Sequence, residues 1–409
     1  MILKTHRKAD KVILTLQGPL TISRSILIPV DQASADKLTE LRYGKDQGTQ
    51  LDGGEDRTCR VTKVVPLDEA LGIDRLPFKM SAQLMLRCAF WAQNQCSYQA
   101  AEDVILDVLK MKINDDTIRM VTNTIGKIIF ENDSFAAEKA WKQLNECKLE
   151  FSYSKPGVLY IESDGAALNT RHLNDEGSSW RENKLGAVFS SDNIKSHKNS
   201  KTGQMEHHIE KREYVSLIGE VATFKKHLLN CALKNGYGQY KTTVILSDGA
   251  SWIANMAKEV FPDAVHILDF FHLCENVYTY AKYKFNFNDA AYVPWAERIC
   301  DLLKKGKLEE VMAEIKGGPN YDGCVNLEHY LNLHKDHINY PEYLEKGFFI
   351  GSGAIESGNK VVLQKRLKQA GMRWEVESAQ YLLSIKSKVE SGLWATEVVN
   401  PVLAHYGVG

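Results

Sequence analysis

The chain of 409 residues has almost no net charge, few prolines and no long hydrophobic run. Lys and Arg total 51 against 52 Asp and Glu, so any attraction to nucleic acid must come from local patches. The eight cysteines are scattered and include no Cys-x-x-Cys pair, which is typical of reduced thiols in a cytosolic protein. The sequence shows neither a signal peptide nor about eighteen consecutive apolar residues, so we expect a cytoplasmic protein without a membrane span.

The composition, 44% hydrophobic and 25% charged, is that of a globular protein, and the length predicts two or three domains. Residues 1–78 alternate short β-type runs (KVILTL, SILIPV, CRVTKVV) with turn-rich text such as GKDQGTQLDGGEDR. We predict a small β-containing module there and assign no chemistry to it.

Residues 79–135 have helical periodicity and suggest a DNA-binding unit. Apolar positions from Ala101 to Leu109 follow one helix face, and a break at 110–113 is followed by Asn114, a good N-cap. Ile118, Val121, Ile125 and Ile129 then continue an apolar stripe. Two helices joined by a short turn resemble a helix-turn-helix, although helical hairpins without a DNA role are equally common. Residues 136–155 are predicted to be a linker.

Three later β-type runs each end in an aspartate: VLYIESDG at Asp164, TTVILSDG at Asp248 and AVHILD at Asp269. A strand followed at once by Gly lets the chain turn away and leaves the acid at the strand end, where neighbouring strands bring carboxylates together. With the runs KLGAVFSS and YVSLIGEV and a helix near 222–233, the order β-β-β-α-β-α-β predicts a mixed sheet with flanking helices. Clustered carboxylates favour Mg²⁺ over softer metals, but a single strand-terminal Asp is more often a turn former or helix cap.

A third acid, Glu356, lies in FFIGSGAIESGNKVVLQKRLKQAGMRW, where a Gly-rich turn leads into a helix. The segment from Asn359 to Trp374 contains five cations and no acid. A basic stripe beside a carboxylate suits a site that holds a DNA backbone, although an ordinary solvated helix face has the same pattern. The candidate DNA-binding residues are Lys360, Lys365, Arg366, Lys368, Arg373 and Trp374. Trp374 could stack on an unpaired base or be part of the core.

In order, the two SDG strands, FPDA, Asp269-Phe-Phe-His272, GSGAIESGNK and GMRW resemble the Mutator-like DDE transposases of bacterial insertion sequences. The resemblance covers roughly residues 79–394. It implies an RNase-H-like α/β core in which Asp164, Asp248 and Glu356 are the catalytic and metal-binding acids, with Asp269 and His272 in a supporting role. It also implies a mostly helical insertion, which we place at 273–350 between core parts at 156–272 and 351–409. Some relatives carry a cysteine-based zinc motif near the N-terminus, but this chain has only Cys59 there.

The resemblance implies a transposase that uses Mg²⁺, or Mn²⁺ in its place, to cut DNA at the element ends and transfer the freed strand to target DNA. Its partners would be the terminal inverted repeats, target DNA and further copies of the chain, and we expect it to act at the nucleoid. An RNase-H-like nuclease without strand transfer is the nearest alternative. A DNA-binding regulator that has lost catalysis is another, but the presence of all three acids in order argues against it.

Overall fold

The computed structural model describes residues 1–43, 63–198, 203, 205–318 and 322–407. The chain divides into two compact units, residues 1–125 with 399–409, and residues 126–398. The predicted turn GKDQGTQLDGGEDR, Cys59 and most of the run CRVTKVV lie outside the described residues.

The first unit begins with a β-hairpin, whose two strands contain the predicted β-type runs KVILTL and SILIPV almost entirely. Strands β1 (Leu3–Thr15) and β2 (Gly18–Pro29) pair antiparallel, and Ile13 and Ile26 are buried. Buried Asp68 accepts ion-pair contacts from Lys11 and Arg24 at 3.1 and 2.9 Å. The remaining short elements are α1 (Gln32–Tyr43), α2 (Pro66–Ala70), η1 (Ile73–Arg75), η2 (Pro77–Lys79) and α16 (Asn400–His405).

The predicted helical segment contains three helices, α3 (Ala82–Asn94), α4 (Tyr98–Leu109) and α5 (Asp115–Asn145). Lys110 has a left-handed backbone (φ 55°) that ends α4, and the Asn114 side chain accepts the Thr117 N–H at 2.9 Å at the start of α5. The stripe of four apolar residues from Ile118 to Ile129 is buried, as predicted. The first half of the predicted linker is helical, because α5 continues unbroken to Asn145 with Ala137 and Ala140 buried.

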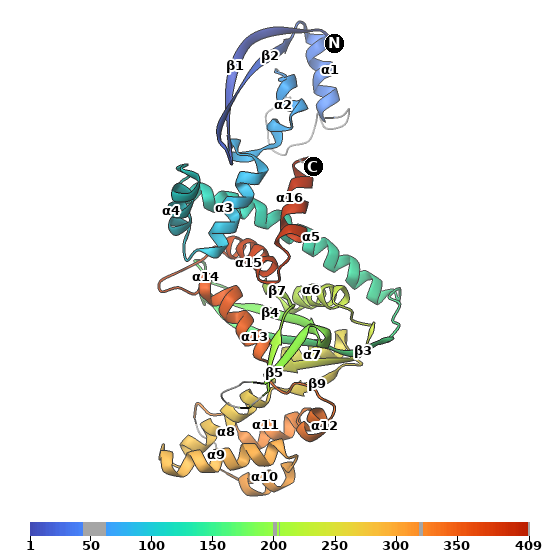
Figure 1. The fold of residues 1–409 in the computed structure, drawn as a ribbon, viewed down its shortest axis with the longest axis vertical. Coiled ribbons are helices and arrows are strands. Elements are labelled where there is room, and N and C mark those ends of the chain that lie inside the picture. The colour runs from blue at the N-terminus through green and yellow to red at the C-terminus, as the bar shows by residue number, and fades with distance from the viewer. Residues whose placement is uncertain (44–62, 199–202, 204, 319–321, 408–409) are drawn as a thin grey trace. The chain divides into compact units, whose positions relative to one another are not determined.

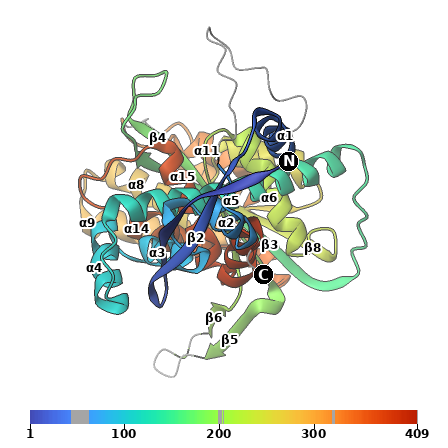
Figure 2. The same cartoon turned by 90° about the horizontal axis from the view of Figure 1, so that it is seen from above.

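The second unit is a mixed α/β fold built on a five-stranded sheet of order β7-β4-β3-β8-β9 (Figure 1). Strands β3, β4 and β7 pair antiparallel, whereas β8 and β9 continue the sheet parallel to β3. The order β-β-β-α-β-α-β is confirmed, with one unpredicted addition, the β5–β6 hairpin seen in Figure 2. The strands are β3 (Lys155–Asn169), β4 (Trp180–Ser190), β5 (Ile194–Lys198), β6 (Met205–Ile209), β7 (Glu213–Ile218), β8 (Tyr240–Ser247) and β9 (Val265–Leu268).

The two faces of this sheet are buried under different helices. Leu159, Ile161 and Ile245 pack with α6 (Val221–Lys234) and α7 (Ser251–Val260). Tyr160 and Leu246, one residue along each strand, face the other way and pack with the segment 270–348. Because side chains alternate along a strand, Asp164 and Asp248 belong to the second face.

The predicted insertion at 273–350 is helical, as expected. Its helices are α8 (Phe270–Lys284), α9 (Asp289–Lys304), α10 (Leu308–Ile315), α11 (Leu327–His334) and α12 (Tyr340–Glu345), with a short turn of 3-10 helix, η4 (Lys335–His337). The C-terminal part contains α13 (Gly353–Gly358), η5 (Asn359–Gln364), α14 (Lys365–Leu367), α15 (Val376–Glu390) and η6 (Trp394–Val399). Across the described ranges, no helix is both long and apolar enough to cross a membrane.

Candidate active site

Asp164 and Asp248 lie where neighbouring parallel strands stop pairing. The β3–β8 pairing runs to Glu162 opposite Leu246, so each aspartate stands two residues beyond the last paired position of its strand. Burial and the negative charge of Asp248 raise the pKa of Asp164. The charge of Asp248 therefore acts on the Asp164 carboxyl, as expected for two acids at one site.

The turn predicted after each SDG motif forms at only one of them. After β8, Gly249 adopts φ +95° and the Asp248 carboxylate accepts the Ala250 N–H at 2.9 Å. Strand β3, in contrast, continues through Gly165 to Asn169, because β4 remains paired with it beyond the end of β8. The expected turn at Gly165 is wrong. A Cβ at this position would lie 2.3 Å from Oε1 of Glu182, so the glycine allows that side chain a close approach.

Glu356 lies on α13, which packs on β4 and on β3, the strand that carries Asp164. Asn359, three residues further on, donates an amide hydrogen bond to Oδ2 of Asp164 at 2.5 Å. A Cβ at Gly358 would lie 2.6 Å from the Tyr214 ring, which shows how closely this helix packs on the sheet. The Glu356 side chain is exposed, whereas Ile355, Val362 and Leu367 are buried, as predicted for the core-facing side of the helix.

The helix that carries Glu356 changes type one turn later. Residues 353–358 are α-helical, and η5 (Asn359–Gln364) is π-helical before the α-helix resumes at Lys365. A π-segment inserts extra residues into a turn, and such segments are frequent at functional sites. The segment begins at Asn359, the residue bonded to Asp164.

Asp269 and His272 are held together at the start of α8. Asp269 is fully buried, and its Oδ1 accepts the His272 N–H at 2.8 Å and lies 3.4 Å from Nδ1 of the same histidine. Its Oδ2 accepts hydrogen bonds from the N–H and the hydroxyl of Ser352. Burial opposes ionisation, but the hydrogen bonds from His272 and Ser352 lower the pKa of Asp269. The contact with the Asp269 carboxylate in turn raises the pKa of His272 to about 9.

The carboxylates of Asp164 and Asp248 suit a hard divalent cation, but the structure does not place a third acid beside them. Asp164 and Asp248 supply carboxylate oxygens, which Mg²⁺ prefers, and a cation between them would relieve their mutual repulsion. Oδ1 of Asn359 is a buried oxygen without a hydrogen-bond partner beside Asp164. However, among the described residues no group of three or more His, Cys, Asp or Glu side chains could hold a metal ion. Glu356 is therefore not placed as a third ligand here.

The predicted basic stripe is divided between surface and core. Lys360, Lys365, Lys368 and Arg373 are exposed. Arg366 is 1% exposed and its guanidinium lies 5.1 Å from the centroid of the Trp374 ring, while the indole N–H of Trp374 donates to the Leu367 carbonyl at 3.0 Å. Arg366 and Trp374 are therefore buried in this structure, which agrees with the alternative that Trp374 is part of the core and differs from the expected exposure of Arg366 on a basic surface.

Two residues of this region were missed by sequence reasoning. Glu162, two residues before Asp164, is 1% exposed, and burial raises its pKa to about 8. Tyr330 of α11 donates its hydroxyl to the backbone carbonyl of Asp248 at 3.3 Å. Glu162 stands in the quoted run VLYIESDG, where alternation puts it on the same face as Asp164. Nothing in the sequence marks Tyr330, whose contact depends on tertiary packing.

Protonation of His272 is expected to make stability depend on pH. The pKa of about 9 lies above its ordinary value of 6.5, so the ion pair with Asp269 contributes fully below about pH 6.5 and is lost as pH rises through about 9. The free energy of unfolding, measured by urea denaturation across this range, should fall more for the wild type than for His272→Gln. Parallel curves for the two proteins would contradict the pairing.

No protein-family model matches the chain, and no curated protein matches it.

Proposed function

We propose that the chain is an insertion-sequence transposase with an RNase-H-like core, which uses Mg²⁺ to cut DNA and to join the freed end to a target. The observation that carries the proposal is the pair of acids, Asp164 and Asp248, beside each other where adjacent parallel strands stop pairing. An antiparallel three-stranded part continued by two parallel strands is also the sheet arrangement expected of an RNase-H-like core.

In the proposed reaction the chain supplies positioning and charge rather than a covalent nucleophile. Asp164 and Asp248 would hold the metal with Glu356 as the third acid, once its exposed side chain turns toward them. Bound divalent ions would activate a water and stabilise the departing oxygen. Asp269 fixes His272 close enough to both aspartates for its positive charge to act on them. A cationic His272 at this place would attract a DNA phosphate.

The joining step distinguishes a transposase from a nuclease of the same fold. The test uses the purified full chain, Mg²⁺, a supercoiled plasmid and labelled duplexes copied from the DNA that flanks the gene. A transposase should leave a 3′-OH at an inverted-repeat end and attach the labelled strand to the plasmid. Cleavage without attachment would favour the nuclease, and specific binding without cleavage would favour the regulator.

The four exposed cations that follow Glu356 are proposed to contact DNA phosphates. Lys360→Ala and Arg373→Ala should each weaken binding and reduce the slope of log K against log salt by about 0.9, because each removes one phosphate contact. Fluorescence anisotropy at several salt concentrations measures this slope. Lys346→Ala is the matched control, since Lys346 is exposed just after α12 and pairs with Glu342. Slopes equal to that of the control would show that these cations do not contact DNA phosphates.

A further inference from the structure

The segment that carries Glu356 is fastened to the sheet at three points. Ser352 bonds to Asp269 after β9, the Ile355 N–H donates to Oε2 of Glu162 on β3 at 2.7 Å, and Asn359 bonds to Asp164, also on β3. Each acceptor is a carboxylate from a strand or its end. The segment 352–359 is therefore hydrogen-bonded to these carboxylates before, beside and after Glu356.

Glu162 is the least expected of these carboxylates. It is 1% exposed and shares its face of the sheet with Tyr160, whose ring is part of the apolar core. A buried carboxylate is costly unless hydrogen bonds compensate it, and an apolar residue of similar size would often stabilise a fold more. The compensation here comes from the first turn of α13, through the N–H group of Ile355 at 2.7 Å. The N–H groups of a first turn have few partners inside their own helix, and the Ile355 N–H otherwise has only the longer contact with the Ser352 carbonyl at 3.2 Å.

The donor, Ile355, immediately precedes Glu356 in the chain. Its bond to Glu162 fixes the backbone next to Glu356 to β3, and the Asn359 side chain bonds to Asp164 on the same strand one turn later. A functional side chain must be held to within about 0.5 Å of its working position, which requires support from its surroundings. The bond to Glu162 therefore fixes the position of α13 along β3, the strand that carries Asp164.

We propose that Glu162 is a positioning residue that holds the Glu356 helix against β3 by accepting the Ile355 N–H group. Its effect on catalysis rests on the proposed function, whereas its effect on the helix does not. Removal of the carboxylate should loosen the segment 352–359 and leave Asp164 and Asp248 in place.

The test compares Glu162→Ala and Glu162→Gln with the same two changes at Glu213. Glu213 is also a buried carboxylate, on β7, but it accepts the Asn235 side-chain amide. Hydrogen exchange measured by mass spectrometry on the full chain reports the peptides that cover residues 350–360. Exchange there should be at least about tenfold faster in Glu162→Ala and intermediate in Glu162→Gln, whose carbonyl can still accept one N–H. The Glu213 variants should leave these peptides unchanged.

A second measurement links the helix to the reaction. Glu162→Ala should raise the Mg²⁺ concentration needed for half-maximal cleavage several-fold while DNA affinity stays constant, and Glu162→Gln should recover part of the loss. Unchanged exchange at 350–360 in both Glu162 variants overturns the inference even if the chain is a transposase. If exchange at 350–360 is faster in the Glu162 variants but the wild type cuts no DNA, the positioning role of Glu162 is supported and the proposed function is contradicted. Glu162→Gln preserves size, so the test stands if Glu162→Ala does not fold.

Discussion

Asp164→Asn and Asp248→Asn are each expected to reduce DNA cleavage by at least about a thousandfold, a loss of roughly 4 kcal/mol in transition-state stabilisation. Asn keeps the size of the side chain but supplies no negative charge to a cation. Glu356→Gln should have the same effect if its side chain joins the site. The rate of single-turnover DNA cleavage, measured with saturating protein over a series of Mg²⁺ concentrations, gives the loss for each variant.

The control for these changes is an acid of the same type outside the site. Asp301→Asn serves, because Asp301 is exposed on α9 and pairs with Lys305, the residue that follows the helix, at 2.6 Å. DNA affinity and thermal unfolding should match the wild type in all four variants. Cleavage retained in one of the three acid variants would remove that residue from the catalytic set.

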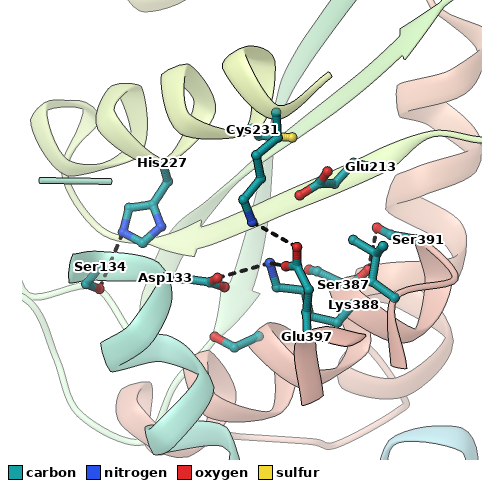
Figure 3. A network of polar contacts seen from close by, with 12 residues as sticks. Asp133, Ser134, Glu213, His227, Cys231, Ser387, Lys388, Ser391 and Glu397 are labelled. Atoms are coloured by element: carbon teal, nitrogen blue, oxygen red, sulfur yellow. Dashed lines mark hydrogen bonds and ion pairs between the residues drawn. The ribbon is translucent and has the colours of Figure 1, made fainter. Parts of the chain in front are cut away.

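Lys388→Met should cause the largest loss of stability among the changes considered. Lys388 of α15 is 5% exposed and contacts Asp133 of α5 at 3.0 Å and Glu397 of η6 at 2.6 Å, with Glu213 nearby (Figure 3). Burial favours the neutral amine, but the charges of Asp133, Glu397 and Glu213 raise the pKa of Lys388. Its removal would leave three acids without their shared cation.

The expected cost of Lys388→Met is about 3 kcal/mol, the lower end for breaking a buried ion pair, because Asp133 and Glu397 keep part of their exposure to water. Urea denaturation of the full chain measures it. A second change, Glu213→Gln, should recover part of the loss by removing one uncompensated charge. Lys346→Met, at an exposed pair, is the control and should cost almost nothing. Equal stability of the two methionine variants would contradict the network.

The sheet could be predicted from the sequence because its strands are buried on both faces. The stretches VLYI and VIL that precede the polar ends of VLYIESDG and TTVILSDG are continuously apolar, and Tyr160 and Leu246 bury one face while Ile161 and Ile245 bury the other. The extent of β3 could not be predicted, because it depends on how far β4 remains paired with it.

The candidate site was predicted in part. Helical periodicity placed Ile355, Val362 and Leu367 correctly in the core. It could not show that Arg366 turns inward, since each extra residue in the π-segment rotates the following positions by about 100° relative to a regular helix. The partners of Glu162 and Asn359 are 193 and 195 residues away in the chain, so no local pattern contains those contacts.

The central claim is that Asp164, Asp248 and Glu356 share a metal site, and Mn²⁺ binding tests it most directly. Electron paramagnetic resonance of a Mn²⁺ titration counts the ions bound by the full chain without any DNA or activity. The account predicts saturable binding by the wild type, competed by Mg²⁺ and lost or weakened at least about tenfold in Asp164→Asn, Asp248→Asn and Glu356→Gln, but not in Asp301→Asn. Equal binding by the wild type and all three acid variants would contradict it.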